Sequence, residues 1–332
     1  GKDVRISEID SLRGIAVIFV MLYHYTSFVS TLNDSEFVFH LGFYGVNLFF
    51  TISGFVIYMT LSNVKSIKQF LINRVSRIFP AYLGALFVTY GVLFFFSDRN
   101  IPFSMFMINL SMMQEFFNVG HVDGVYWTLT RELIFYFFIT MTILFRVVKI
   151  EVVIIAFMIY TIVIKIITSK FLVESSAYAD YLLFLNNYTW YFFQGIALFL
   201  LYRDERFDYK RIAIILLSIV LTYGSGHTLS LITNLIFILL FILMYYKKLN
   251  LINHVSLRYI GTISYSLYLL HNEIGMIMIY ALYPYVDWWS ILITCIAMII
   301  ISIFFYNYVE RPLGKKCKNY LSNNNDNRNI RV

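Results

Sequence analysis

Charged residues are scarce in this chain of 332 residues. They make up 14% of the sequence, whereas roughly a quarter of the residues in a soluble domain are charged. Apolar residues make up 60% and recur from end to end in runs of about 20, the length that crosses a bilayer as a helix. Barrel strands are shorter and alternate in polarity. The composition therefore predicts an all-α, polytopic bundle of transmembrane helices.

Cysteine is also scarce, and this excludes two further classes of protein. The chain has only two cysteines, Cys295 inside an apolar run and Cys317 near the end, so neither a disulfide framework nor a cysteine-based metal site is expected. The histidines have no short metal-binding spacing, and we expect no metal. The first apolar run carries Arg13 and His24 and has no small-residue cleavage site, so it does not read as a removable signal peptide.

The apolar runs predict ten spans, and one further run is ambiguous. The spans are 11–30, 41–61, 80–97, 126–145, 151–169, 180–202, 211–225, 228–246, 259–282 and 288–308. The segment 101–120 is apolar but is broken by Gln114 and Glu115, which predicts an interfacial or re-entrant segment.

Lysine and arginine predict the orientation of the bundle. If the N-terminus is cytoplasmic, 22 of the 26 basic residues fall on the cytoplasmic side, as the positive-inside rule requires. Both ends are then cytoplasmic, and the net charge of +7 follows from the loops without a nucleic-acid partner. We expect a membrane domain over 1–315 and a polar, disordered tail over 316–332.

An arginine and a histidine share one face of the first span. Arg13 and His24 are eleven residues apart, which is three helical turns plus about 20°, or about 16 Å along the axis. His24 can therefore lie near the midplane while Arg13 lies at the surface. An ionisable group at that depth is costly unless it faces protein or water, so its default interpretation is functional.

Two other spans carry titratable groups at overlapping depths. Glu132 and Tyr136 lie one turn apart near the start of the fourth span, and Tyr268 and His271 share a face of the ninth. His271 is about 18 Å from the cytoplasmic end of its helix, a depth close to that of His24. Such groups suit a catalytic centre, but they also suit the proton relay of a transporter or lipid flippase.

Polar residues form a stripe on the second span. Asn47, Thr51, Gly54 and Tyr58 follow the spacing of one helix face. Small and polar stripes of this kind mediate helix packing more often than catalysis, and we favour packing here.

Two arginines stand at the cytoplasmic start of the third span. Arg74 and Arg77 are three residues apart, so they are neighbours on a helix surface. They are typical of an interfacial anchor, and paired guanidinium groups also suit phosphate binding. On the spacing alone the anchor is the favoured interpretation, and phosphate binding is the alternative.

In order along the chain, these motifs resemble the acyltransferase-3 family of integral membrane acyltransferases. The resemblance covers residues 5–315 and rests on six elements. They are Asp10-x-Leu-Arg13-Gly14 with His24, Leu48-Phe-Phe-x-Ile-Ser53-Gly54-Phe55, Arg74-x-x-Arg77-Ile-x-Pro80-x-Tyr82, Trp127-Thr-Leu-x-x-Glu132-x-x-Phe135-Tyr136, Ser264-Tyr265-Ser-Leu-Tyr268-Leu-x-His271 and Glu310-Arg311-Pro312. One departure is visible, because many members have two consecutive acidic residues where this chain has Glu132-Leu133.

The resemblance implies a reaction and its partners. The donor is expected to be acetyl-CoA or another acyl-CoA on the cytoplasmic side. The acceptor is expected to be a hydroxyl of a cell-envelope sugar, such as an O-antigen polysaccharide or an undecaprenyl-linked glycan, in the bacterial inner membrane. No extracytoplasmic hydrolase-like domain is visible, so donor and acceptor are expected to meet within the membrane domain.

Site residues are assigned from the residues and the resemblance together. We expect His24 to act as general base, with an acyl-histidine intermediate as an open alternative, and Glu132 to orient or charge-balance its imidazole. Arg13 joins these two as a catalytic candidate. The resemblance and the pairing of arginines place the coenzyme at Arg13, Arg74, Arg77 and Ser53. Candidates for the acceptor or for support of the site are Asp10, Asn47, Tyr58, Trp127, Tyr136, Tyr268 and His271.

Overall fold

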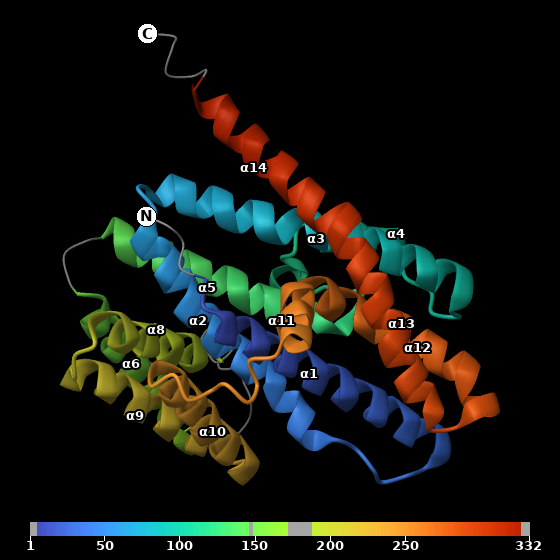
Figure 1. The fold of residues 1–332 in the computed structure, drawn as a ribbon, viewed down its shortest axis with the longest axis horizontal. Coiled ribbons are helices and arrows are strands. Elements are labelled where there is room, and N and C mark those ends of the chain that lie inside the picture. Colours follow the sequence, from blue (N-terminus) through green and yellow to red (C-terminus); the bar gives the residue numbers. More distant parts are fainter. Residues whose placement is uncertain (1–4, 146–148, 172–187, 327–332) are drawn as a thin grey trace. The chain divides into compact units, whose positions relative to one another are not determined.

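The computed structural model describes residues 5–145, 149–171 and 188–326, and every element in these ranges is a helix (Figure 1). The described residues cluster into two compact units. Unit 1 consists of residues 1–8, 46–63 and 131–252, and unit 2 of residues 9–45, 64–130 and 253–332. The fold class predicted from composition, an all-α membrane protein, agrees with this structure.

Unit 2 contains the first helix, the third helix and the C-terminal helices. Its elements are α1 (Ser7–Asn33, from Ile9 on), η1 (His40–Tyr44), α3 (Ile67–Phe96), α4 (Phe103–Asn109), η2 (Gln114–Phe117), η3 (Gly124–Tyr126), α11 (Val255–Thr262), α12 (Ser264–Val286), α13 (Trp289–Phe305), the π-helical turn η4 (Tyr306–Glu310) and α14 (Arg311–Asp326). Helix α12 packs against α3 and α13, and α14 packs against α3.

Unit 1 contains the second helix and the central helices. Its elements are α2 (Gly45–Asn63), most of α5 (Trp127–Leu144), α6 (Ile150–Phe171), α8 (Thr189–Asp204), α9 (Tyr209–Gly224) and α10 (Thr228–Tyr245). Helix α9 packs against α6, α8 and α10.

Seven helical segments of the described residues are long and apolar enough to cross a membrane. They are Ser7–Asn33, His40–Asn63, Ile67–Phe96, Gly124–Leu144, Ile150–Lys170, Thr228–Tyr245 and Trp289–Asn323. The other three predicted spans contain α8, α9 and α12, which are not among the seven. The count of ten and the orientation of the ends therefore stay predictions.

Two segments, residues 101–120 and the C-terminal tail, test expectations made from composition. The segment 101–120 contains only the seven-residue helix α4 and the short turn η2, too little helix to span a bilayer. The tail expected to be disordered is instead helical as far as Asp326, because α14 continues from α13 through η4. Residues 327–332 lie outside the described residues.

The polar stripe of α2 is a packing surface, as its spacing favoured. All four of its members face α8. The amide of Asn47 lies 3.3 Å from the hydroxyl of Tyr191, and the ring of Tyr58 packs against Phe199. Between them, Thr51 accepts a 3.3 Å hydrogen bond from the amide of Gln194.

Glycines allow α2 and α8 to approach closely. A Cβ added to Gly54 would collide with the backbone oxygen of Phe192, and one added to Gly195 would collide with that of Thr51. Gln194 lies at this crossing, is fully buried and also bonds Asn234 of α10 and Ser218 of α9. Polar bonds of this type join helices in an apolar solvent.

We predict that Gly54→Ala destabilises the protein because the new methyl group has backbone rather than a flexible side chain in its way. Overpacking of this kind costs roughly 1–3 kcal/mol. Gly224→Ala is the matched control, since a Cβ there meets no atom within 4 Å. Thermal unfolding in detergent should show a lower midpoint for Gly54→Ala only, and equal midpoints would contradict the close crossing.

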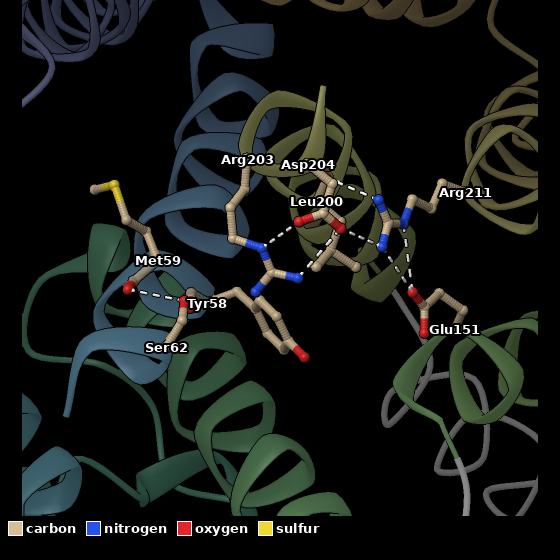
Figure 2. Close-up of polar contacts among 8 residues, drawn as sticks. All are labelled: Tyr58, Met59, Ser62, Glu151, Leu200, Arg203, Asp204 and Arg211. Carbon is tan, nitrogen blue, oxygen red and sulfur yellow. Dashed lines mark hydrogen bonds and ion pairs between the residues drawn. The ribbon is translucent and has the colours of Figure 1, made fainter. Parts of the chain in front are cut away.

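A cluster of charges joins three helices of unit 1 near the end of α8 (Figure 2). Arg211 of α9 is 8% exposed and lies between two carboxylates, 2.6 Å from Asp204 and 3.4 Å from Glu151 of α6. It also donates to the backbone oxygen of Leu200 at 3.0 Å. Arg203 bonds both carboxylate oxygens of Asp204, at 2.7 and 3.3 Å. The two arginines and two carboxylates balance in charge.

These contacts make stability depend on pH. The hydrogen bond from Arg203, followed by that from Arg211, lowers the pKa of Asp204 to about 2. The carboxylate's contribution to stability is therefore fully present above its unfolded pKa of about 3.9 and is lost as the pH falls toward 2. We predict that Asp204→Asn flattens the fall in the unfolding midpoint between pH 5 and pH 3, whereas Glu205→Gln does not. Identical pH profiles for wild type and Asp204→Asn would contradict this.

Candidate active site

Two histidines from distant parts of the sequence are in direct contact in unit 2. Nδ1 of His24 on α1 lies 2.8 Å from Nε2 of His271 on α12, and the rings are stacked with centroids 5.0 Å apart. His271 is fully buried, while His24 is partly exposed. The contact agrees with the similar depth expected for the two residues. The expected distance of about 18 Å to the end of the helix is wrong, because α12 begins at Ser264, seven residues or about 10 Å before His271.

The backbone of α12 determines which nitrogen carries each proton. Nδ1 of His271 lies 2.8 Å from the backbone oxygen of Tyr268 and 3.2 Å from that of Leu267. Carbonyl oxygens only accept, so this Nδ1 must carry a proton, and the Nε2 of a neutral His271 is then an acceptor. Nδ1 of His24 must donate to it, which leaves Nε2 of His24 with a lone pair. These tautomers are inferred from the hydrogen bonds.

A tyrosine and a glycine bring α1 against α12 at this point. The hydroxyl of Tyr25 donates to the backbone oxygen of His271 at 2.7 Å. The ring of Tyr25 lies against Gly275, where any Cβ would collide with it. The residue next to His24 therefore anchors the helix that carries His271.

Glycines also bring α1 against α11, and one of them belongs to the Asp10–Gly14 motif. A Cβ on Gly14 would collide with the backbone oxygen of Leu257 in α11, and one on Gly261 would collide with that of Asp10. Helices α1 and α11 thus cross in backbone contact. Because α12 begins at Ser264 directly after α11, this crossing helps to set where α12 starts.

The loop before α5 clamps α12 on both sides of His271. Asp123 is fully buried, and its carboxylate accepts from the side-chain amide of Asn272 at 3.0 Å and from the backbone nitrogen of Glu273 at 3.3 Å. The hydroxyl of Tyr268 donates to the backbone oxygen of Val125 at 2.8 Å. The clamp therefore holds α12 three residues before and one to two residues after His271.

Burial and a nearby cation, Arg99, act on the pKa of Asp123 in opposite directions. Burial raises the pKa of Asp123, against the opposing effect of the donors from Asn272, Val125 and Glu273 and of the nearby Arg99. Arg99 forms a 2.8 Å ion pair with Glu273 and bonds the backbone oxygen of Val122 at 3.1 Å. Sequence reasoning missed Asp123 because it stands in a loop. Its place just before the Trp127 motif was the only signal.

The arginine candidates of unit 2 differ in exposure. Arg13 is partly exposed and lies 3.5 Å from Asp10, which is 5% exposed. Arg74 is only 9% exposed, whereas its neighbour Arg77 is exposed. The pair is thus not a symmetrical fork. Trp127 is partly buried.

The remaining candidates, Glu132, Ser53, Tyr136, Asn47 and Tyr58, belong to unit 1. The hydroxyl of Ser53 donates to Glu132 at 2.5 Å. Glu132 belongs to unit 1 and His24 to unit 2, so the orienting role expected of Glu132 stays a prediction. Tyr136 is 8% exposed. Within the described residues, no three His, Cys, Asp or Glu side chains are grouped to hold a metal ion.

Comparison with known proteins gives two matches. The family model described as "Acyltransferase domain" matches residues 6–307. A protein of Acidianus two-tailed virus named "Putative acetyltransferase ORF330" is 32% identical over 141 residues, which are 41% of this chain and 40% of that protein. The chain thus matches less than half of that relative's length. No solved structure matches the chain.

We predict that Asp123→Ala destabilises the clamp, because it leaves the amide of Asn272 and two backbone N–H groups without an acceptor. Each buried donor left unsatisfied costs about 1–3 kcal/mol, so the unfolding midpoint should fall by about 5 °C or more. Asp98→Ala, an exposed change in the same connection, is the control. A midpoint that is equally unaffected in both variants would show that the clamp contributes nothing.

Proposed function

Because the chain belongs to the acyltransferase-3 family, we propose that it is an O-acyltransferase that moves an acetyl group from acetyl-CoA to a hydroxyl of a cell-envelope sugar. The family assignment rests on a model that covers nearly the whole chain, and the chain is a membrane acyltransferase. This assignment favours acyl transfer over the proton relay of a transporter, which buried histidines alone would also fit.

The observation that carries the proposal is the tautomer of His24 that its hydrogen bond to His271 fixes. Its Nδ1–H is committed to His271, so Nε2 is the atom that can take a proton. A neutral imidazole suits this role near neutral pH, and general bases contribute about 10²–10⁴-fold to rates. The bond to His271 keeps the ring fixed while Nε2 changes its protonation state.

The proposed step is a direct transfer. Nε2 of His24 takes the proton of the acceptor hydroxyl as the hydroxyl oxygen bonds to the thioester carbonyl carbon. The carbon–sulfur bond then breaks, and the leaving thiolate takes the proton back from His24. The products are an acetyl ester and free coenzyme A thiol, and His24 returns to its starting state.

The donor carries phosphates, and the cationic side chains Arg13, Arg74 and Arg77 fit such a partner. Guanidinium groups bind phosphates through charge-assisted, often bidentate hydrogen bonds. The exposed Arg77 suits direct contact and the buried Arg74 suits support beside it. We keep the roles predicted for Glu132 and Ser53, which bond one another. Both assignments are part of the proposal.

We predict that His24→Gln and His24→Ala lower transfer at least about 100-fold, because no group is left to accept the hydroxyl proton. His271→Ala should lower it about 10–100-fold, because His24 loses the partner that fixes its tautomer. The measurement is the acetyl released by alkali from envelope polysaccharide of bacteria that express each variant, quantified by mass spectrometry.

The control is His227→Ala, an exposed histidine between α9 and α10. All variants must be present in the membrane at equal amounts. Wild-type acetylation by His24→Ala would remove the base assignment. Polysaccharide of equal mass with and without the wild-type chain would contradict envelope sugar as the acceptor.

A further inference from the structure

A cationic surface of unit 2 has no role in the steps above apart from that of Arg77. It lies on the first half of α3 and on α14, which pack against one another (Figure 1). Helix α3 has 30 residues, about 45 Å of helix, whereas the hydrocarbon core is about 30 Å thick. Its predicted span starts at residue 80, so residues 67–79 extend beyond it on the predicted cytoplasmic side.

Helix α14 approaches α3 through a glycine. A Cβ on Gly314 would lie 3.0 Å from the backbone oxygen of Ser76. That oxygen lacks its usual intrahelical donor, because residue 80 is a proline without an N–H. The close approach therefore places α14 beside residues 67–79 of α3, at the turn that precedes Pro80.

Positive charge dominates these two segments. The exposed cationic side chains are Lys65, Lys68, Arg77, Arg311, Lys315, Lys316 and Lys318. Over residues 64–79 and 310–323, Glu310 is the only acidic residue. We call the seven exposed cations together the α3–α14 surface.

The one carboxylate is already engaged. Glu310, the last residue of the π-helical turn, accepts a 3.0 Å hydrogen bond from Ser266 of α12. Arg77 is the cation whose charge acts on it. Glu310 therefore offsets one of the seven charges, and the lysines of α14 remain in excess.

We propose that the α3–α14 surface binds the nucleotide end of the donor, the 3′-phosphorylated adenosine diphosphate of acyl-CoA. This inference rests on the proposed function. The nucleotide end carries a 3′-phosphate and a diphosphate, and a compact polyanion in water is the complement of clustered lysines. Arg77 joins the surface to the arginines already assigned to the donor.

Helix geometry favours a soluble polyanion over lipid headgroups. Helix α14 continues α13 through the π-helical turn η4 without a break in the helix (Figure 1). Its 16 residues extend about 24 Å beyond the predicted end of the last span. Lys315, Lys316 and Lys318 follow that end by seven to ten residues, or about 10–15 Å of helix, which is slightly more than the Debye length of about 8–10 Å over which exposed charges mainly act.

The test compares wild type with one variant, and each protein is assayed with three donors. Lys315→Gln, Lys316→Gln and Lys318→Gln are combined, and KM and kcat are measured with acetyl-CoA, 3′-dephospho-acetyl-CoA and acetyl-pantetheine. The KM for acetyl-CoA should rise about tenfold with kcat unchanged, and the KM for acetyl-pantetheine should stay constant. Added salt should raise the wild-type KM for acetyl-CoA more than that of the variant.

The matched control is Lys247→Gln with Lys248→Gln, two exposed lysines between α10 and α11, which should leave every KM unchanged. An unchanged KM for acetyl-CoA in the triple variant would overturn the proposal. So would an equal rise with acetyl-pantetheine, or a KM that follows the phosphatidylglycerol content of nanodiscs rather than the phosphates of the donor.

Failure of the proposed function can be distinguished from failure of the α3–α14 surface as a binding site. If wild type transfers acetyl from none of the donors, calorimetry with adenosine 3′,5′-bisphosphate tests the surface alone. Binding that weakens about tenfold in the triple variant supports the surface without the reaction. Absent or unchanged binding overturns it.

Discussion

The hydrogen bond between His24 and His271 is the interaction on which the rest of the site depends. It determines which nitrogen of His24 is available, and it does so with a neutral partner. In serine-protease triads an aspartate holds the histidine and stabilises its charged form. Here an imidazole fixes the tautomer without placing a negative charge on the ring. The fixed point is the α12 backbone, because carbonyls of Leu267 and Tyr268 hold the proton on His271.

Such a site demands that α12 neither rotate nor slide, and two kinds of contact prevent this. Backbone contact at Gly261 places the preceding helix α11 against α1, and Gly275 accepts the ring of Tyr25. The Asp123 clamp adds hydrogen bonds on either side of His271. A rotation of α12 by one residue step, about 100°, would turn His271 away from His24 and break the contacts of Gly275 with Tyr25 and of Asp123 with α12. Close packing and polar bonding thus enforce the same register.

Sequence reasoning placed His24 and His271 in the same layer but did not identify them as partners. Spacing along a helix gives distance from the membrane surface, which is why His24 and His271 could be placed in the same layer. It also identified the α2 stripe as packing, although not its contact with α8. The choice among partners depends on helix rotation and on loops. Helix spacing alone did not identify the bonded pairs, which are His24 with His271 and Glu132 with Ser53. Asp123 was missed for the same reason.

Helix α14 shows how composition can mislead. Its polar sequence predicted disorder, but a segment that continues an existing helix does not bear the cost of nucleating a new one, and it gains packing on α3 through Gly314. Helix α12 contacts both the start of this cationic region and the histidine pair. Ser266 reaches Glu310 beside the cationic surface and His271 reaches His24, only five residues, or about 7.5 Å of helix, further along. One rigid helix thus sets the positions of both groups.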